Sequence, residues 1–322
     1  MQEGTLSAPE RRPGVLVLGG TGCIGRHVCA AFARRGYRVL AVARTPAAHL
    51  AGFAFRSVDL TRAATEAIVR LLAEADAEVV VNATDAANAT DGWDRNEEEL
   101  TSANVAVAER LVEAMDTLPG RRRLVHIGTI HEYGPGAAGV PLDEDVEPRP
   151  VNAYARSKLA GSQVVLRAAR AGAVDGVVLR LVNTCGPDPS PASFPGKLLP
   201  LLRDAVHGRP LELAIADAMR DWIDVRDVAE AAVRAAELPV AGQVFNIGSG
   251  VAVPMREVVA LCLAAAGLSP AAVTEKAAPV RSLGADWIQA DIRRARERLQ
   301  WEPRISLKES LQDMWDKGST SR

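Results

Sequence analysis

Short apolar runs alternate with segments of helical periodicity along this chain. Residues Val15–Leu18 are all apolar, which is typical of a strand buried on both faces of a parallel sheet. The pattern then predicts a helix from Ile24 to about Arg35, with Gly36 as its stop, and a second strand from Arg38 to Val42. This order of elements predicts a βαβ unit at the start of the fold.

The turn between the first strand and the first helix has glycines at positions 19, 22 and 25. Backbone without side chains can approach a pyrophosphate closely, and the free N–H groups and dipole of a helix N-terminus favour its negative charge. Because a strand precedes the turn and a helix follows it, the turn predicts a dinucleotide site rather than a glycine-rich turn without a ligand. The residues expected to bind the cofactor here are Gly19, Thr21, Gly22, Cys23, Ile24 and Gly25.

The end of the second strand bears on the choice of nicotinamide cofactor. An acidic residue there would hydrogen-bond a free ribose 2′-hydroxyl and repel a 2′-phosphate, but the chain reads Ala41-Val42-Ala43-Arg44-Thr45. A guanidinium forms paired hydrogen bonds with phosphate oxygens, so Arg44 predicts NADP(H) with the 2′-phosphate on this side chain. The alternative is a surface arginine that only closes the strand.

The alternation of strands and helices continues to about Val182, and a strand over Val244–Ile247 is expected to return to the sheet. The predicted fold class is therefore α/β, a Rossmann doubly wound parallel sheet with a smaller, discontinuous C-terminal substrate-binding lobe. Prolines after Asn183 indicate that this lobe begins as an ordered loop. The predicted parts are a disordered tail (1–12), the dinucleotide-binding domain (13–182 and 222–247) and the substrate lobe (183–221 and 248–318).

A candidate catalytic pair, Tyr154 and Lys158, lies near the middle of the chain. One helical turn separates the two residues, so both project from the same face. A neighbouring cation favours the phenolate, and Lys158 is therefore expected to lower the pKa of Tyr154 from about 10 toward the working range. The alternative is a tyrosine that packs on a neighbouring helix beside a solvated lysine.

Together these motifs resemble the extended short-chain dehydrogenase/reductase family of nucleotide-sugar epimerases, dehydratases and ketoreductases, and the resemblance covers nearly the whole chain. It implies that Asp59 and Leu60 contact the adenine and that Asn82 and Ala83 end a strand lining the cofactor. It also implies that Asn104 supports a proton-relay water. Further segments match in sequence order: Arg180–Pro187, Arg220–Val228, Phe245–Gly250 and a closing helix at Ala290–Arg296.

The resemblance also implies the catalytic roles. In the family, a hydroxyl four residues before a Tyr-Gly pair donates to the reacting carbonyl, and Tyr133-Gly134 places Thr129 in that role. Tyr154 would carry the proton, while Lys158 would tune it and hold the nicotinamide ribose.

On the substrate side, the resemblance places Asn183 and Arg220 at positions that contact the substrate, and Lys197 is a further candidate. The guanidinium of Arg220 is chemically suited to a diphosphate. Its alternative role is an ion pair with Asp221 or Asp224.

The family leaves several reactions open. Its 4,6-dehydratases carry an Asp-Glu pair directly after the catalytic threonine, whereas this chain has Ile130-His131, so dehydration is not expected. Arg44 favours a net reductase over an epimerase, and the segment around Thr129 is similar to that of 4-ketoreductases that finish deoxysugars. The leading hypothesis is NADPH-dependent reduction of a dTDP-4-keto-6-deoxyhexose. The alternatives are an NAD-dependent nucleotide-sugar 4-epimerase and a cofactor-binding regulatory protein without catalysis.

Composition excludes several other classes. The net charge of −2 gives no electrostatic case for nucleic acid or an acidic membrane, and no run is long enough to span a bilayer. The four cysteines lack metal-ligand or redox-pair spacing, so a cytoplasmic enzyme with reduced thiols and no metal is expected. Predicted helices near 97–116 and 152–171 carry alanine and leucine on one side, which favours a homodimer through a four-helix contact over burial within one monomer.

Overall fold

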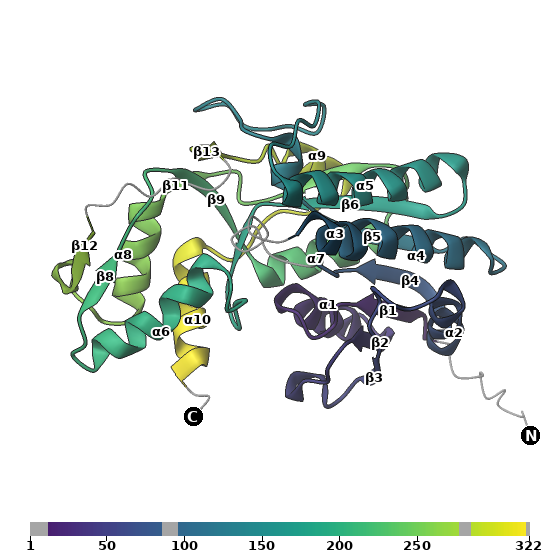
Figure 1. Ribbon diagram of the computed structural model, residues 1–322, viewed down its shortest axis with the longest axis horizontal. Helices are drawn as coiled ribbons and strands as arrows, with labels where there is room; N and C mark the ends of the chain where they lie inside the picture. The colour runs from purple at the N-terminus through teal and green to yellow at the C-terminus, as the bar shows by residue number, and fades with distance from the viewer. Residues whose placement is uncertain (1–11, 86–95, 277–284, 320–322) are drawn as a thin grey trace, which may run out of the picture.

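The larger part of the protein is built on a seven-stranded sheet in which every hydrogen-bonded pair of strands is parallel (Figure 1). The computed structural model describes residues 12–85, 96–276 and 285–319, so the predicted disordered tail lies outside the described residues apart from Arg12. In spatial order the strands are β10 (Val244–Ile247), β6 (Asp175–Leu181), β5 (Arg123–Thr129), β4 (Ala77–Asn82), β1 (Gly14–Leu18), β2 (Arg38–Ala43) and β3 (Ala54–Ser57).

The strand order reverses at β1. Strands β2 and β3 extend from one side of it, and β4, β5, β6 and β10 extend from the other. In such sheets the connections leave a crevice at the carboxyl ends of the strands beside the reversal. This topology confirms the predicted doubly wound Rossmann fold class, and the returning strand Val244–Ile247 has the predicted bounds.

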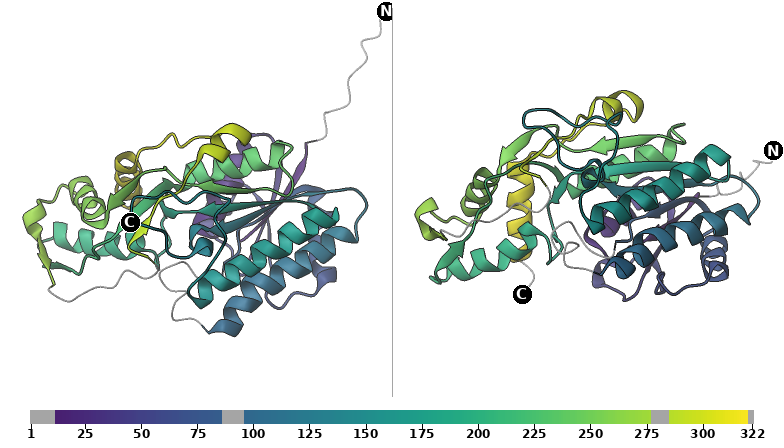
Figure 2. Two further views of the ribbon diagram at one scale, coloured as in Figure 1. Left: turned by 90° about the horizontal axis from the view of Figure 1, so that it is seen from above. Right: turned by 45° about the horizontal axis from the view of Figure 1, so that its top comes forward.

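Two layers of helices cover the sheet, one on each face (Figure 2). The first layer contains α1 (Cys23–Arg34) and α7 (Val225–Glu237), which pack against each other. The second contains α2 (Thr65–Ala75), α4 (Val107–Asp116) and α5 (Ala153–Ala171).

Strand β1 shows why its sequence is apolar at every position. Val15 and Val17 belong to the core beneath α1 and α7, whereas Leu16 and Leu18 belong to the core beneath α2, α4 and α5. None of the four side chains has any exposed surface. A strand in the middle of a parallel sheet buries both faces, so alternation of apolar and polar residues is not expected.

The helix predicted near 97–116 is divided into three parts. α3 (Glu97–Thr101) passes into a π-helical turn over Ser102–Ala106, and α4 follows directly. Gly161 of α5 lies against this turn, and a Cβ there would collide with the carbonyl oxygen of Asn104. The close approach of the two helices accompanies the π turn, which helical periodicity does not predict. Such turns are frequent at functional sites.

A smaller lobe lies beside the sheet and has a core of its own (Figure 1). One sheet in this lobe joins β7 (Asn183–Cys185), β9 (Met219–Asp224), β11 (Ala252–Pro254) and β13 (Trp287–Ile288), and β8 (Leu211–Leu213) pairs with β12 (Val273–Glu275). The helices that contribute to its core are α6 (Phe194–Val206), α8 (Met255–Ala265) and α10 (Leu307–Ser319). The domain boundaries given above stay predictions.

The prolines of the predicted loop fall into two groups. Those from Pro187 to Pro191 lie in the connection before α6, but Pro195 and Pro200 lie within the helix itself. Proline is tolerated in a first turn because the N–H that it lacks has no helical partner there. Ser193 caps the helix by accepting the Gly196 N–H at 3.2 Å. The lobe therefore has an ordered loop after β7, and the helix that follows it contains Pro195 in its first turn and Pro200 in its interior.

The chain ends with two helices. Where the resemblance implied a closing helix, the structure has the short α9 (Arg293–Arg298), and α10 follows it. Within residues 12–85, 96–276 and 285–319, no helix is both long and apolar enough to cross a bilayer. The four cysteines are free, and the same residues contain no cluster suited to a metal ion.

Candidate active site

A cavity of about 890 Å³ opens where the strands of the large sheet end. The glycine turn forms one side of it, and the segments that follow β2, β3, β4, β5 and β6 continue around it. This is the edge at which a doubly wound sheet binds its ligand. Among the predicted site residues, the cavity is lined by Gly19, Thr21, Gly22, Cys23, Ile24, Arg44, Asp59, Leu60, Ala83, Thr129, Tyr154, Lys158 and Asn183.

The glycine turn leaves room for a ligand because its glycines pack closely. Gly19 has a φ of +80°, which favours glycine, and a Cβ on Gly25 would collide with the Gly19 carbonyl oxygen. Gly25 itself lies behind the turn and supports it. Helix α1 starts without a side-chain cap, so a ligand can satisfy its first N–H groups. These features fit a pyrophosphate.

The residues predicted to contact the adenosine part of the cofactor lie at the far end of the cavity. Arg44 is exposed directly after β2, and no carboxylate follows that strand before β3. Asp59 lines the cavity, but its Oδ1 accepts the N–H and the hydroxyl of Thr61 at 3.0 and 2.7 Å. The hydrogen bond from the Thr61 side chain lowers the pKa of Asp59. The residues at this end thus fit a dinucleotide with an anionic group near Arg44.

The structure brings the three catalytic candidates together. Thr129 is the last residue of β5, and Tyr154 and Lys158 lie one turn apart at the start of α5. Asn152 caps this helix by accepting the Ala155 N–H at 2.8 Å. The side chains of Thr129 and Tyr154 both line the cavity. Two hydroxyl groups from distant parts of the chain therefore meet in the cavity.

The pKa of Tyr154 is raised, which corrects the prediction that Lys158 lowers it. Burial is the first cause and the Asp85 carboxylate the second. Asp85 Oδ2 lies 3.2 Å from the Tyr154 hydroxyl and 3.7 Å from Lys158 Nζ, and Lys158 also donates to the Ile127 carbonyl at 2.7 Å. The phenol is therefore protonated at neutral pH and suited to donate a proton.

Sequence reasoning missed Asp85. It follows β4 by three positions, and parallel strands deliver such residues to the same edge as Thr129 and the glycine turn. A carboxylate at the carboxyl end of a central strand was the available signal.

Asn104 supports the site from behind. Its Nδ2 donates to the Ser157 hydroxyl at 2.9 Å, and that hydroxyl donates to the Tyr154 carbonyl at 2.8 Å. Its Oδ1 is buried without a hydrogen-bond partner in the described part of the chain. A role for Asn104 in a proton relay stays a prediction.

Asn82 also lies behind the cavity. Its amide contacts His126 Nδ1 at 3.2 Å, and its Oδ1 accepts the N–H and the hydroxyl of Thr84. Burial, followed by the charge of Lys158, lowers the pKa of His126 to about 3. Asn82 therefore orders the segment that carries Ala83 and Asp85 into the cavity.

The substrate-side candidates are spread out. Asn183 lines the cavity and donates to the Asp221 carbonyl at 3.2 Å. Arg220 is buried, and burial lowers its pKa to about 10; it donates to the carbonyls of Met219 and Ala285. Lys197 lies on α6. Arg220 and Lys197 do not line the cavity among the described residues, so their substrate contacts stay predictions.

His131 is a second lining residue whose role the sequence did not assign. Burial, followed by the charge of Arg220, lowers the pKa of His131 to about 4, so the imidazole is neutral at physiological pH. The cavity wall therefore holds a neutral imidazole at this position.

Several known proteins are similar to this chain over its full length. A dTDP-6-deoxy-L-talose 4-dehydrogenase (NAD(P)(+)) of Kitasatospora kifunensis is 36% identical over 321 residues, which is 98% of this chain and 99% of the relative. A UDP-glucose 4-epimerase of Rhizobium leguminosarum bv. trifolii is 28% identical and covers 94% of this chain and 96% of its own length.

Solved structures agree with these relatives. MoeE5 in complex with UDP-glucuronic acid and NAD superposes with a TM-score of 0.84 at 27% identity, covering 96% of this chain and 100% of the other. The sequence profile of the NAD dependent epimerase/dehydratase family matches residues 15–248, which include the glycine turn and the Thr129, Tyr154 and Lys158 set. The chain therefore belongs to the NAD dependent epimerase/dehydratase family, the group that its sequence motifs resemble.

Proposed function

We propose that this enzyme reduces the 4-keto group of a dTDP-4-keto-6-deoxyhexose with NADPH. The observation that carries the proposal is that Thr129, Lys158 and a protonated Tyr154 line one cavity, whose far end presents Arg44. The Kitasatospora kifunensis relative is a 4-dehydrogenase of a dTDP-6-deoxy sugar. Oxidation at C4 is the reverse of reduction at C4, so the same hydroxyl groups would serve either direction.

The chemistry of the site follows from its hydroxyl groups. Bound NADPH would supply a hydride for C4 of the sugar. Thr129 and Tyr154 donate hydrogen bonds to the C4 oxygen, where negative charge develops, and Tyr154 transfers its proton to that oxygen. Lys158 is placed to stabilise the phenolate that remains.

The cofactor would lie along the cavity. The turn from Gly19 to Gly25 and the start of α1 would hold the pyrophosphate, and Asp59 and Leu60 would border the adenine. Arg44 would hold the 2′-phosphate, and Lys158 the nicotinamide ribose.

Cofactor consumption tests the reaction. Purified enzyme is incubated with dTDP-4-keto-6-deoxyglucose and related keto sugars plus NADPH, and absorbance and product stereochemistry are followed. A reductase oxidises one NADPH for each C4 hydroxyl formed. An epimerase, the alternative represented by the Rhizobium leguminosarum relative, interconverts C4 epimers without net oxidation of cofactor. A binding protein does neither, and that result would end the proposal.

Arg44→Ala tests the cofactor assignment. Loss of hydrogen bonds to a charged group costs about 1.5–3 kcal/mol, so the KM for NADPH should rise about ten- to hundredfold. The KM for NADH should change little, because NADH has no 2′-phosphate. Initial rates with each cofactor measure the effect, and Arg62→Ala, at an exposed side chain nearby, is the matched control. A preference for NADH that survives Arg44→Ala refutes the assignment.

A homodimer is part of the proposal. Helices α4 and α5 lie side by side on one face of the sheet (Figure 2). The structure buries most of the alanine and leucine side of these helices within the monomer, so the proposal rests on charge instead. The outward residues of α3 and α4 are largely acidic, and α5 exposes Arg156, which pairs with Glu97 of the same chain at 2.7 Å, together with Arg167 and Arg170. Two copies related by a twofold axis could pair these complementary charges around a four-helix contact.

A further inference from the structure

A fully buried carboxylate lies directly behind Thr129. Glu132 has no exposed surface, and its Oε1 accepts the Thr129 N–H at 3.0 Å and the Ser162 hydroxyl at 2.9 Å. Its Oε2 accepts Arg180 Nε at 2.8 Å, and the Arg180 side chain is also buried. One side chain thus fixes the backbone of the candidate oxygen-polarising residue.

The local sequence is adapted to this carboxylate. Ile130–Tyr133 forms a single 3-10 turn, and the Thr129 hydroxyl oxygen accepts the His131 N–H at 3.4 Å. Because that oxygen serves as an acceptor toward the turn, the hydroxyl hydrogen is free to be donated into the cavity. A Cβ on Gly128 would lie 2.5 Å from Glu132 Oε1, so any larger residue there would displace the carboxylate.

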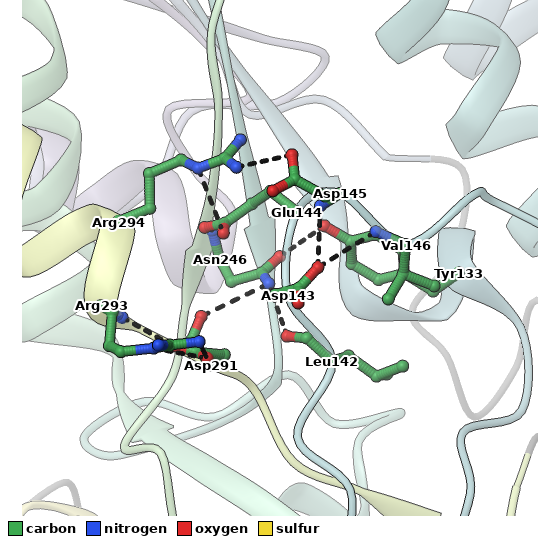
Figure 3. Close-up of polar contacts among 10 residues, drawn as sticks. All are labelled: Tyr133, Leu142, Asp143, Glu144, Asp145, Val146, Asn246, Asp291, Arg293 and Arg294. Carbon is green, nitrogen blue, oxygen red and sulfur yellow. Dashed lines mark hydrogen bonds and ion pairs between the residues drawn. The ribbon is translucent and has the colours of Figure 1, made fainter.

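The support extends outward from Arg180. Its guanidinium lies 4.3 Å from the centre of the Tyr133 ring, and the Tyr133 hydroxyl donates to Asn246 Oδ1 at 2.9 Å. Figure 3 shows Asn246 held in turn by the Leu142 carbonyl and by Glu144. A satisfied buried network holds its members in one arrangement. The orientation of Thr129 is therefore tied to the returning strand β10.

We propose that Glu132 is a positioning residue that acts through Thr129, holding its hydroxyl toward the reacting carbonyl while Arg180 and Ser162 hold the carboxylate. The inference rests on the proposed function for the role of Thr129. The expected size of each effect favours a role of Glu132 in positioning Thr129 over a role in stabilising the fold. A buried ion pair adds little net stability compared with apolar residues of equal volume. A preorganised donor at a developing oxyanion contributes about 10²–10³ to turnover.

The test is a double-mutant cycle with Glu132→Gln and Thr129→Ala. In Glu132→Gln, the new NH2 group is a donor that must face another donor, either the Thr129 N–H or Arg180. The value of kcat should therefore fall about 10²-fold. The KM for the keto sugar and the Kd for NADPH should change by less than about threefold. In the Thr129→Ala background, Glu132→Gln should lower kcat by less than about threefold, because its target is gone. Equal losses in both backgrounds would mean a merely structural role and would overturn the proposal.

Asp227→Asn provides the matched control. Asp227 is also a buried carboxylate that accepts two backbone N–H groups, those of Arg304 and Ile305, and it lies on α7 away from Thr129. Its replacement should lower the melting temperature without the kcat loss. If Glu132→Gln fails to fold, adding Arg180→Gln restores an amide pair, and the cycle is run on that double variant.

Hydrogen exchange gives a readout that does not depend on turnover. The amide of Thr129 should exchange faster in Glu132→Gln than in the wild type, and at the wild-type rate in Asp227→Asn. If the wild type reduces no keto sugar, the proposed function fails, and exchange alone decides whether Glu132 positions Thr129. Unchanged exchange at Thr129 overturns the positioning role.

Discussion

Tyr154→Phe is expected to lower kcat for the keto sugar by about 10³-fold while the Kd for NADPH stays near the wild-type value. The change removes both the proton and one hydrogen bond to the C4 oxygen, and it leaves the ring in its buried position. The cofactor contacts of the glycine turn and Arg44 are untouched. Initial rates with keto sugar and a fluorescence titration with NADPH measure the two effects separately.

Tyr37→Phe is the matched control for this experiment. Tyr37 is partly buried and packs edge-on against Phe32, with ring centres 5.0 Å apart, far from the cavity lining. Its replacement should leave both kcat and NADPH affinity unchanged. Full activity in Tyr154→Phe would contradict the proposed mechanism, because Tyr154 is the group that gives its proton to the C4 oxygen.

The raised pKa of Tyr154 agrees with the proton-donor role that the proposed mechanism gives this residue. A phenol whose pKa is raised by burial and by Asp85 is protonated at neutral pH, as a proton donor for reduction must be. Oxidation at C4 needs the phenolate instead. The raised pKa therefore supports the proposed role of Tyr154 as a proton donor.

The sequence predicted the parts of the site that depend on short segments. The glycine turn, Arg44 and the Tyr154 and Lys158 pair each belong to one local motif whose geometry follows from a turn or a helix. Their meeting at one edge follows from the parallel sheet. These predictions required only the order of elements along the chain.

The remaining features depend on contacts between distant residues. Asp85 and Tyr154 are 69 positions apart, and Arg180 and Glu132 are 48 positions apart. The spacing of residues along the chain does not indicate such pairs. The raised pKa of Tyr154 and the buried Glu132 carboxylate behind Thr129 could therefore not be predicted. The π turn at Asn104 was missed for the same reason, because it accompanies the approach of Gly161 from another helix.

The largest expected effect on stability is at Asp221, a residue with no exposed surface on β9. Its Oδ1 accepts the N–H and the hydroxyl of Ser249 at 2.8 and 2.6 Å, and its Oδ2 accepts the N–H groups of Gly250 and Ala290 at 3.0 and 3.1 Å. The carboxylate thus joins β9 to the segments that follow β10 and β13. Asp221→Asn turns one acceptor oxygen into a donor that faces other donors.

The expected loss is about 3 kcal/mol in the free energy of unfolding, measured by urea denaturation followed by circular dichroism. Leaving a buried donor unsatisfied costs about 1–3 kcal/mol. If the NH2 group of the asparagine takes the place of Oδ2, the N–H groups of Gly250 and Ala290 both lose their acceptor. Burial raises the pKa of Asp221, so the cost of desolvating the carboxylate already offsets part of its hydrogen-bond energy. The net loss is therefore smaller than a sum over four hydrogen bonds.

Asp217→Asn, at an exposed carboxylate of the same lobe, should change the free energy of unfolding by less than about 0.5 kcal/mol. An unfolding free energy equal to that of the wild type would contradict the view that Asp221 joins β9 to the segments that follow β10 and β13. It would imply that the segments after β10 and β13 are held by their packing around Val182 and Ile292 instead.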